Sequence, residues 1–230
     1  MDRKSELLSN LTNVQKKVSA AGVRASRAEG EITLIAVTKN FPSSDVELLA
    51  EIGISDVGEN KDQEAKQKYK ETKSKLVWHF IGQLQSNKVK SVVSYAHYVH
   101  SVDRLNLAKE ISKQCVAINK EIQVFIQVDL GEDNQNRGGV APKSLPLLAA
   151  EIETLPKVKL VGLMAVAPLN TAPADAFEKL IEIRAGFLQD HPQARLLSIG
   201  MSDDFETAIE FGATHLRIGS LLLGVRPNLR

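Results

Sequence analysis

Eight short apolar segments alternate with helical patterns along the chain, and this alternation restricts the fold more than any other feature of the sequence. The strand-like segments span residues 32–40, 54–60, 76–82, 97–102, 121–130, 158–166, 195–200 and 214–219. Strands that alternate with helices predict a parallel sheet, and eight units in 230 residues fit one closed (β/α)8 TIM barrel, which typically has about 250 residues. Residues 1–230 are therefore expected to form a single domain, with a doubly wound open sheet as the alternative fold.

An additional helix is expected before the first strand. Its apolar residues follow the three/four spacing of one helical face, and Gly22 is expected to end it. These residues are Leu7, Leu11, Val14 and Val18. The sequence ends about ten residues after the last strand, so no C-terminal β domain is expected.

The composition argues against several kinds of partner. A net charge of +1 gives no overall electrostatic attraction to nucleic acid or to an anionic membrane. No apolar run approaches the roughly 18 residues that span a bilayer, and the charged N-terminus lacks a signal-peptide core. Cys115 is the only cysteine, which excludes an intramolecular disulfide and favours a cytoplasmic location. Its helical spacing with Ala108 and Ile111 predicts a buried apolar role.

The first strand-like segment stops on a lysine, Lys39, followed by Phe41-Pro42. Ser44 and Glu47 have the spacing of a capping box for the next helix. Lys39 is therefore expected at the carboxyl end of the strand, where parallel α/β proteins bind ligands, and its amine could form a Schiff base with an aldehyde. A solvated lysine at a strand exit is the alternative interpretation.

The turns after the last two strands carry glycine and serine. Gly200 precedes Ser202, and the Asp203 to Glu206 spacing is expected to begin a helix. Gly219 and Ser220 repeat the arrangement after the last strand. Loops at these two positions are the usual phosphate site of the barrel, so the pair predicts phosphate binding. Two ordinary glycine turns with serine caps are the alternative.

Arg217 lies on the last strand in phase with His215 and Gly219. An arginine that points into a barrel needs a partner, because an unpaired buried charge is costly. The partner is expected to be a carboxylate, such as Glu59 or Asp129, or the ring nitrogen or acidic group of a ligand.

Residues 61–75 are almost wholly polar, and a solvated helix is the expected structure. Asn60 and Gln63 have the spacing of a capping box at its start, and Asp103 is expected to cap a later helix. Aromatic residues are not interleaved with the charges of this segment, which argues against nucleic-acid binding.

Six segments carry a resemblance to a known family. They read AVTKNFP, VGENKDQEAKQK, WHFIGQLQSNK, HSVDR, GLMAV and IGMSDDFETAIEFGATHLRIGS. This set is similar to the YggS/PROSC family, the pyridoxal-phosphate homeostasis proteins, and it extends in order over about residues 32–224. The resemblance implies a fold-type III PLP-protein barrel that binds pyridoxal 5'-phosphate (PLP).

The resemblance also implies roles for single residues. Lys39 matches the lysine that holds PLP covalently as an internal aldimine. Asn60 matches a residue that lines the cofactor, and Arg217 matches the arginine that faces the pyridine nitrogen. An arginine there tends to leave that nitrogen unprotonated, so the ring becomes a weak electron sink.

The phosphate group is implied to bind Ser202, Gly219 and Ser220. His79 and Met201 lie in family motifs near the site; Met201 is kept as a cofactor-binding candidate, although core packing is the expected role of both. Ser220 stands where many relatives have threonine, which preserves the hydroxyl. Arg137 stands where other members of the family have a lysine, so any accessory role of that lysine in cofactor handling is in question.

The implied function is intracellular PLP (vitamin B6) and amino-acid homeostasis without turnover, by a monomer whose possible acceptors are apo PLP-dependent enzymes. One alternative is a small racemase or decarboxylase. A two-base racemase is disfavoured, because Tyr69, Tyr95 and Tyr98 are the only tyrosines and none is expected beside Lys39. There are two further hypotheses. One is a Schiff-base aldolase that acts on a phosphorylated sugar, and the other is a regulatory module that acts through a protein partner.

Overall fold

A computed structural model describes residues 2–28, 30–131 and 138–224. The strands are β1 (Thr33–Val37), β2 (Asp56–Glu59), β3 (Val77–Phe80), β4 (Tyr98–Val102), β5 (Ile122–Gln127), β6 (Val158–Met164), β7 (Leu196–Met201) and β8 (His215–Ile218). They follow one another in the order of a closed parallel barrel, so the predicted (β/α)8 fold is confirmed and the open sheet is wrong.

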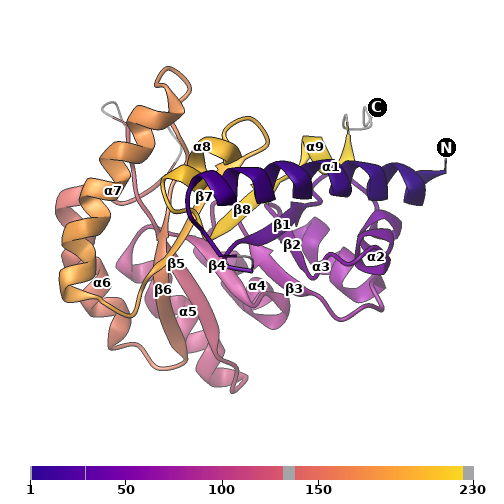
Figure 1. Ribbon diagram of the computed structural model, residues 1–230. Helices are drawn as coiled ribbons and strands as arrows, with labels where there is room; N and C mark the ends of the chain where they lie inside the picture. Colours follow the sequence, from indigo (N-terminus) through magenta and orange to yellow (C-terminus); the bar gives the residue numbers. More distant parts are fainter. Residues whose placement is uncertain (1, 29, 132–137, 225–230) are drawn as a thin grey trace. The chain divides into compact units, whose positions relative to one another are not determined.

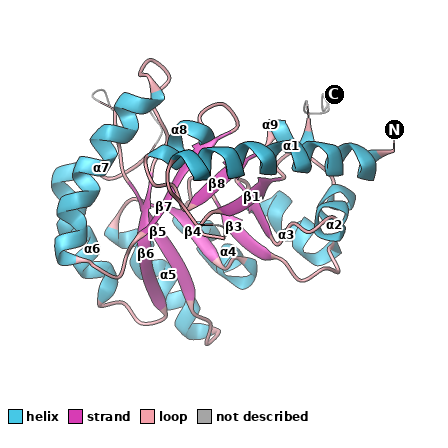
Figure 2. Ribbon diagram, viewed as in Figure 1, coloured by secondary structure: helices cyan, strands magenta, loops and turns pink. Residues whose placement is uncertain are grey.

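Helices separate these strands along the chain (Figure 2). The described helices are α1 (Arg3–Arg24), α2 (Ser43–Glu51), α3 (Asp62–Glu71), η1 (Ser86–Lys88), α4 (Val89–Tyr95), α5 (Leu105–Ala117), η2 (Pro142–Ser144), α6 (Leu145–Glu153), α7 (Pro173–Asp190), α8 (Phe205–Glu210) and α9 (Ser220–Leu223). The chain falls into two compact units, Met1–His79 with Ile199–Arg230, and Phe80–Ser198.

The first unit holds a parallel ladder in which β1 lies between β2 and β8. Ile35 is the register partner of Asp56 on β2 and of Arg217 on β8. Val37 pairs with Gly58, and the Thr38 amide extends the ladder by donating to the Gly58 carbonyl (3.0 Å). The carboxyl ends of β1, β2 and β8 therefore meet at one edge.

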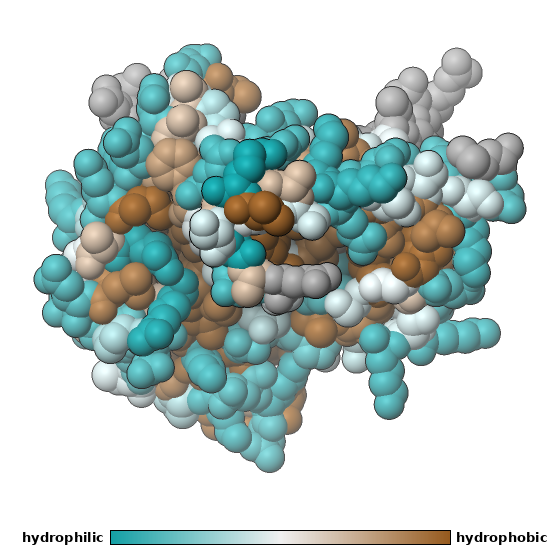
Figure 3. All heavy atoms as spheres, viewed as in Figure 1, coloured by the Kyte–Doolittle hydropathy of each residue, from teal (hydrophilic) through white to brown (hydrophobic). Residues whose placement is uncertain are grey.

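The N-terminal helix α1 lies along α8 and α9 of the same unit (Figure 1). Leu7, Leu11 and Val14 are buried as predicted, while the outward face is drawn largely as hydrophilic in Figure 3. Gly22 does not end the helix, which continues to Arg24; Gly22 is a buried position instead. Packing against α8 and α9 therefore overrides the weak helix propensity of glycine.

The predicted helix caps are wrong in the first unit. No described side chain caps α2; Glu47 accepts bonds from the Lys73 amide and from Ser74 Oγ (2.6 Å). Helix α3 begins after Lys61, and its described start has no side-chain cap from Asn60. Glu47 is recruited by the segment after α3, a tertiary contact that local spacing does not reveal.

The second unit carries the parallel ladder of β4, β5, β6 and the start of β7. Phe125, Val161 and Met164 form a buried core cluster there. Cys115 is fully buried, and burial raises the pKa of its thiol to about 11, so its predicted apolar role is confirmed. Asp103 does not cap α5; it pairs with Arg104 at 2.6 Å.

Candidate functional site

Lys39 lies in a tight turn directly after β1, with only Thr38 between it and the end of the strand. The Phe41 amide donates to the Thr38 carbonyl at 3.0 Å and closes the turn. Asn40 adopts a φ of 66°, a left-handed conformation that asparagine tolerates better than most residues. The side chain of Lys39 is half-buried. The structure therefore places Lys39 at the carboxyl edge of the ladder.

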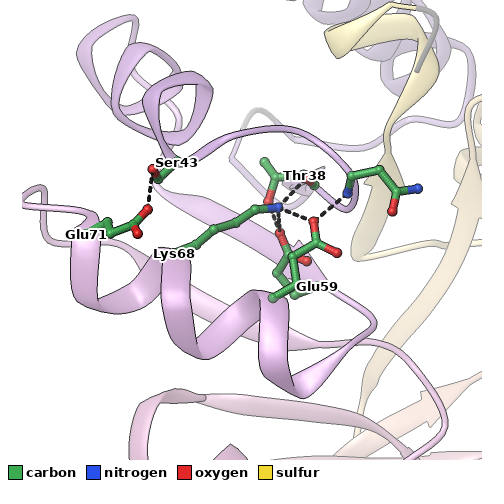
Figure 4. A network of polar contacts seen from close by, with 7 residues as sticks. Thr38, Ser43, Glu59, Lys68 and Glu71 are labelled. Carbon is green, nitrogen blue, oxygen red and sulfur yellow. Dashed lines mark hydrogen bonds and ion pairs between the residues drawn. The ribbon is translucent and has the colours of Figure 1, made fainter. Parts of the chain in front are cut away.

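A buried polar network contacts the residues on both sides of Lys39, and Figure 4 shows its members Thr38, Glu59 and Lys68. Lys68 Nζ donates at 2.6 Å to the Thr38 carbonyl, to Glu59 Oε1 and to Glu64 Oε1. Thr38 Oγ1 donates to the same Glu59 oxygen at 2.6 Å. The Asn40 amide donates to Glu64 Oε1 at 2.5 Å. These bonds hold the two residues that flank Lys39.

The sequence pattern did not predict this network. Lys68 belongs to the polar segment that was expected to be solvated, yet it is only 4% exposed. Ala65, three residues earlier, is buried on the same helix face. The signals that point to the network are this single alanine and the i, i+4 spacing of Glu64 and Lys68. Glu59 is fully buried, and burial raises the pKa of its carboxyl against the pull of the Lys68 ammonium.

Asn60 follows β2, and its side-chain oxygen is buried without a hydrogen-bond donor among the described residues. Its Oδ1 atom is inaccessible to solvent and has no hydrogen-bond partner among the described residues. A buried polar atom of this kind normally finds a partner. The site therefore offers one hydrogen-bond acceptor that a ligand donor could satisfy.

Ser202 joins the turns that follow β7 and β8. Its Oγ accepts from the Gly219 amide at 3.3 Å and from the Leu221 amide at 3.5 Å. Gly200, within β7, has a φ of 91°, which lies in the left-handed region that favours glycine. A Cβ at Gly200 would lie 2.7 Å from the Cβ of Ala208, so close packing also requires glycine there.

The start of α8 differs from the prediction. The helix begins at Phe205, and Asp204 rather than Asp203 closes the turn by accepting from the Met201 amide at 2.6 Å. Met201 ends β7 with 37% of its surface exposed, so its expected core packing is wrong. Its position at the carboxyl end of the strand explains this exposure.

Gly219 could carry a side chain without a clash with the protein. A Cβ at this position would meet its nearest neighbour, the Val37 carbonyl oxygen, at 3.5 Å, and the φ of −114° suits any residue. Protein packing therefore does not require glycine here. Ser220, the first residue of α9, is exposed beside it. Both features suit close approach of a phosphate to backbone amides.

Arg217 is buried, with 5% of its surface exposed. Burial lowers its pKa to about 10, against the opposing effect of the Asp204 carboxylate, so it stays protonated at neutral pH. Of the carboxylates suggested as its partner, Glu59 binds Lys68 and Thr38 through its Oε1 atom. The other suggested partner, Asp129, accepts from the Gly131 amide at 2.9 Å.

Two histidines are buried near Arg217 in the same unit. His79 Nε2 lies 2.8 Å from Asp56 Oδ1, which agrees with its expected core role. The His79 and His215 rings lie 6.1 Å apart. Burial, together with His79, lowers the pKa of His215 to about 4, so His215 is neutral at physiological pH.

The predicted site residues of the first unit thus gather at one edge. Lys39, Asn60 and Gly219 follow three adjacent strands, and Ser202 contacts Gly219. The set combines an amine, an unsatisfied amide oxygen, a buried guanidinium and a group of backbone amides. These groups fit a phosphorylated aromatic aldehyde with a ring nitrogen. Arg137 lies outside the described residues.

Within residues 2–28, 30–131 and 138–224, no three His, Cys, Asp or Glu side chains are arranged to hold a metal ion. Among the helices described, none has the length and apolar character that crossing a bilayer requires.

The fold and this site define a class of protein, a parallel barrel with a lysine after β1 and a glycine-serine turn after β8. The sequence matches the family described as alanine racemase, N-terminal domain, over residues 10–227. It is 39% identical over 242 residues to a pyridoxal phosphate homeostasis protein of Mycobacterium leprae, covering 97% of this chain and 94% of the relative.

A pyridoxal phosphate homeostasis protein of Aquifex aeolicus is 40% identical over 221 residues, which cover 94% of this chain and 96% of the relative. PipY of Synechococcus elongatus, solved with PLP bound, superposes with a TM-score of 0.83 at 31% identity and covers 95% of this chain and 100% of its own. The chain therefore belongs to the alanine racemase N-terminal domain family, among its pyridoxal phosphate homeostasis proteins.

Proposed function

We propose that this chain binds PLP reversibly through a covalent bond to Lys39 and serves intracellular PLP and amino-acid homeostasis. The observation that carries the proposal is the arrangement of Lys39 and Gly219 after adjacent parallel strands, with Ser202 bonded to the Gly219 amide. PLP supplies an aldehyde for an amine and a phosphate for backbone amides. The relatives' names and the PLP-bound PipY structure support this assignment.

In this proposal the Lys39 amine attacks the aldehyde carbon, water leaves, and a carbon–nitrogen double bond remains. Ser202, Gly219 and Ser220 orient the phosphate, and Asn60 and Met201 line the ligand. Arg217 faces the ring nitrogen. Because Arg217 is protonated at neutral pH, it leaves that nitrogen without a proton and weakens the ring as an electron sink.

We further propose that the protein does not turn over amino acids and that it delivers PLP to apo PLP-dependent enzymes as a cytoplasmic monomer. A protonated Arg217 at the ring nitrogen disfavours much carbanion chemistry, but the alanine racemases show that weak protonation of the ring does not forbid catalysis. The family also contains alanine racemases, so a small racemase or decarboxylase is the second candidate. A two-base racemase also needs a tyrosine as the opposing base. Tyr69, which lies on α3 in the first unit, is 43% exposed and packs edge-on against Trp78.

An absorption titration with PLP tests the binding proposal. The wild-type chain should develop the yellow absorption band of a lysine Schiff base with PLP, and the Lys39→Ala variant should not. Lys61→Ala, an exposed lysine of the same unit, is the matched control and should bind normally. A colourless wild-type protein that traps an aldehyde only with a sugar phosphate would favour the aldolase.

Proton exchange in D2O separates the carrier from the enzyme. The PLP-loaded chain should leave the α-hydrogen of added amino acids unexchanged over the time in which a racemase would exchange it completely. Exchange that needs PLP and Lys39 would establish catalysis and contradict the carrier role.

A further inference from the structure

We propose that Lys68, Glu59 and Glu64 form a positioning unit, the turn anchor, that holds the Lys39 turn ready to bond the ligand aldehyde, an inference that rests on the proposed function. Figure 4 shows Lys68 reaching from α3 toward Thr38 and Glu59. The turn anchor contacts the residues before and after Lys39, so it fixes the backbone from which that side chain extends.

The ammonium group of Lys68 has no bonding capacity left for another task. It carries three donors, and the structure gives it three acceptors, the Thr38 carbonyl, Glu59 Oε1 and Glu64 Oε1. It is also 4% exposed. Lys68 is therefore a positioning residue rather than a second site for aldehyde attachment.

The turn anchor lies between α3 and the ends of β1 and β2. Thr38 and Glu59 follow the paired residues Val37 and Gly58, and their side chains bond each other. Lys68 of α3 bonds the Glu59 carboxylate and the Thr38 carbonyl. Lys39 and Asn60 are the next residues of these two segments, so the turn anchor holds the backbone from which the ligand groups extend.

The left-handed Asn40 gives the turn anchor a specific purpose. A residue with a φ of 66° keeps that conformation when surrounding bonds fix it. Glu64 Oε1 accepts from the Asn40 amide and from Lys68 at once. Loss of the turn anchor should therefore release the turn into other backbone conformations and spread the positions of the Lys39 amine.

A double variant, Glu59→Leu/Lys68→Met, tests this inference. Replacing both Glu59 and Lys68 by apolar residues leaves Glu64 as the one charge of the turn anchor, and its side chain is 24% exposed and still accepts from the Asn40 amide, so the chain should fold. The rate of Schiff-base formation with PLP should fall about 10- to 100-fold, as expected when a reacting group loses its orientation. Lys70→Met, an exposed lysine on the same helix, should react at the wild-type rate.

The site of attachment gives a readout that a purely structural role would not change. After borohydride reduction, the share of PLP on Lys39 should fall in the double variant and adducts should appear on exposed lysines. If the folded double variant reacts at the wild-type rate and only at Lys39, the inference is wrong. If the wild-type chain itself fails to attach PLP at Lys39, the proposed function fails first.

A second variant decides the question if the double variant does not fold. Glu64 has a side chain that is 24% exposed, so Glu64→Ala should be tolerated. It removes the acceptor of the Asn40 amide but leaves the Lys68 and Glu59 pair. A folded Glu64→Ala protein with reduced rate and scattered adducts supports the inference, and one with wild-type behaviour overturns it.

Discussion

Ser202 Oγ lies 3.3 Å from the amide nitrogen of Gly219 and so joins the turns after the last two strands. The hydroxyl accepts from that amide and is close to the Leu221 amide. We expect the Ser202→Ala variant to bind PLP more weakly by about 1.5–3 kcal/mol, the range for hydrogen bonds to charged groups. A PLP titration measures this loss. Ser94→Ala, at an exposed serine on α4, should bind as the wild type does, and equal binding by both variants would contradict the phosphate assignment.

Gly219→Ala should fold but bind PLP poorly. The new Cβ would stand 3.5 Å from the Val37 carbonyl oxygen, an ordinary contact, and would occupy space that the phosphate is proposed to approach. Gly200→Ala is the contrasting variant, because its Cβ would lie 2.7 Å from Ala208 Cβ at a φ of 91°. We expect it to lose about 1–3 kcal/mol of stability in urea denaturation. A stable Gly219→Ala protein with full affinity would show that no ligand approaches this glycine.

Arg3 joins three elements of the first unit. Its Nη2 atom lies 2.6 Å from Asp45 Oδ2 on α2 and donates to the Leu223 carbonyl of α9 at 3.0 Å. Because Asp45 has a side chain only 8% exposed, Arg3→Met should cost about 1–3 kcal/mol of stability by leaving buried polar groups unsatisfied.

Lys4 provides the matched control for Arg3. Its ion pair with Glu51 is about half exposed on both sides, so Lys4→Met should change stability by less than about 0.5 kcal/mol. Equal effects of the two variants in urea denaturation would mean that the Arg3 contacts contribute no more than a surface pair.

The strand pattern and the position of Lys39 could be predicted from the sequence, because parallel strands are apolar runs and the polar residue that ends one is visible. Helix starts were predicted poorly. The carboxylate oxygens of Glu47 and Asp204 accept bonds outside the expected caps, and local spacing does not identify those donors.

The turn anchor could not be predicted for a related physical reason. Lys68 stands in a segment whose hydrophilic character is typical of a solvated helix, and lysine is usually exposed. Its burial depends on Glu59 and Thr38, which reach it only after β1 and β2 pair. Met201 was expected to pack in the core. It is exposed instead, because it is the last residue of β7 and lies at the carboxyl end of the strand.

Stability should fall as the pH drops below about 6.5, the ordinary pKa of histidine. His215 has a pKa lowered to about 4, so between these values the unfolded chain binds a proton that the folded chain does not. The full effect corresponds to roughly 3 kcal/mol, since each tenfold change in proton affinity is worth about 1.36 kcal/mol. Burial also lowers the pKa of His79, which adds to the same dependence of stability on pH.

Urea denaturation at a series of pH values tests this dependence. The His215→Gln variant should have a flatter profile between pH 6.5 and about 4, the value to which burial lowers the pKa of His215. A variant profile as steep as that of the wild type would assign the acid sensitivity to other groups.

Mass mapping of the borohydride-reduced, PLP-treated protein tests the attachment of PLP to Lys39 most directly. We predict one pyridoxyl group per chain, located on Lys39, and no modification of Lys68. A pyridoxyl group spread over exposed lysines, or located on a single lysine other than Lys39, would contradict the proposed site.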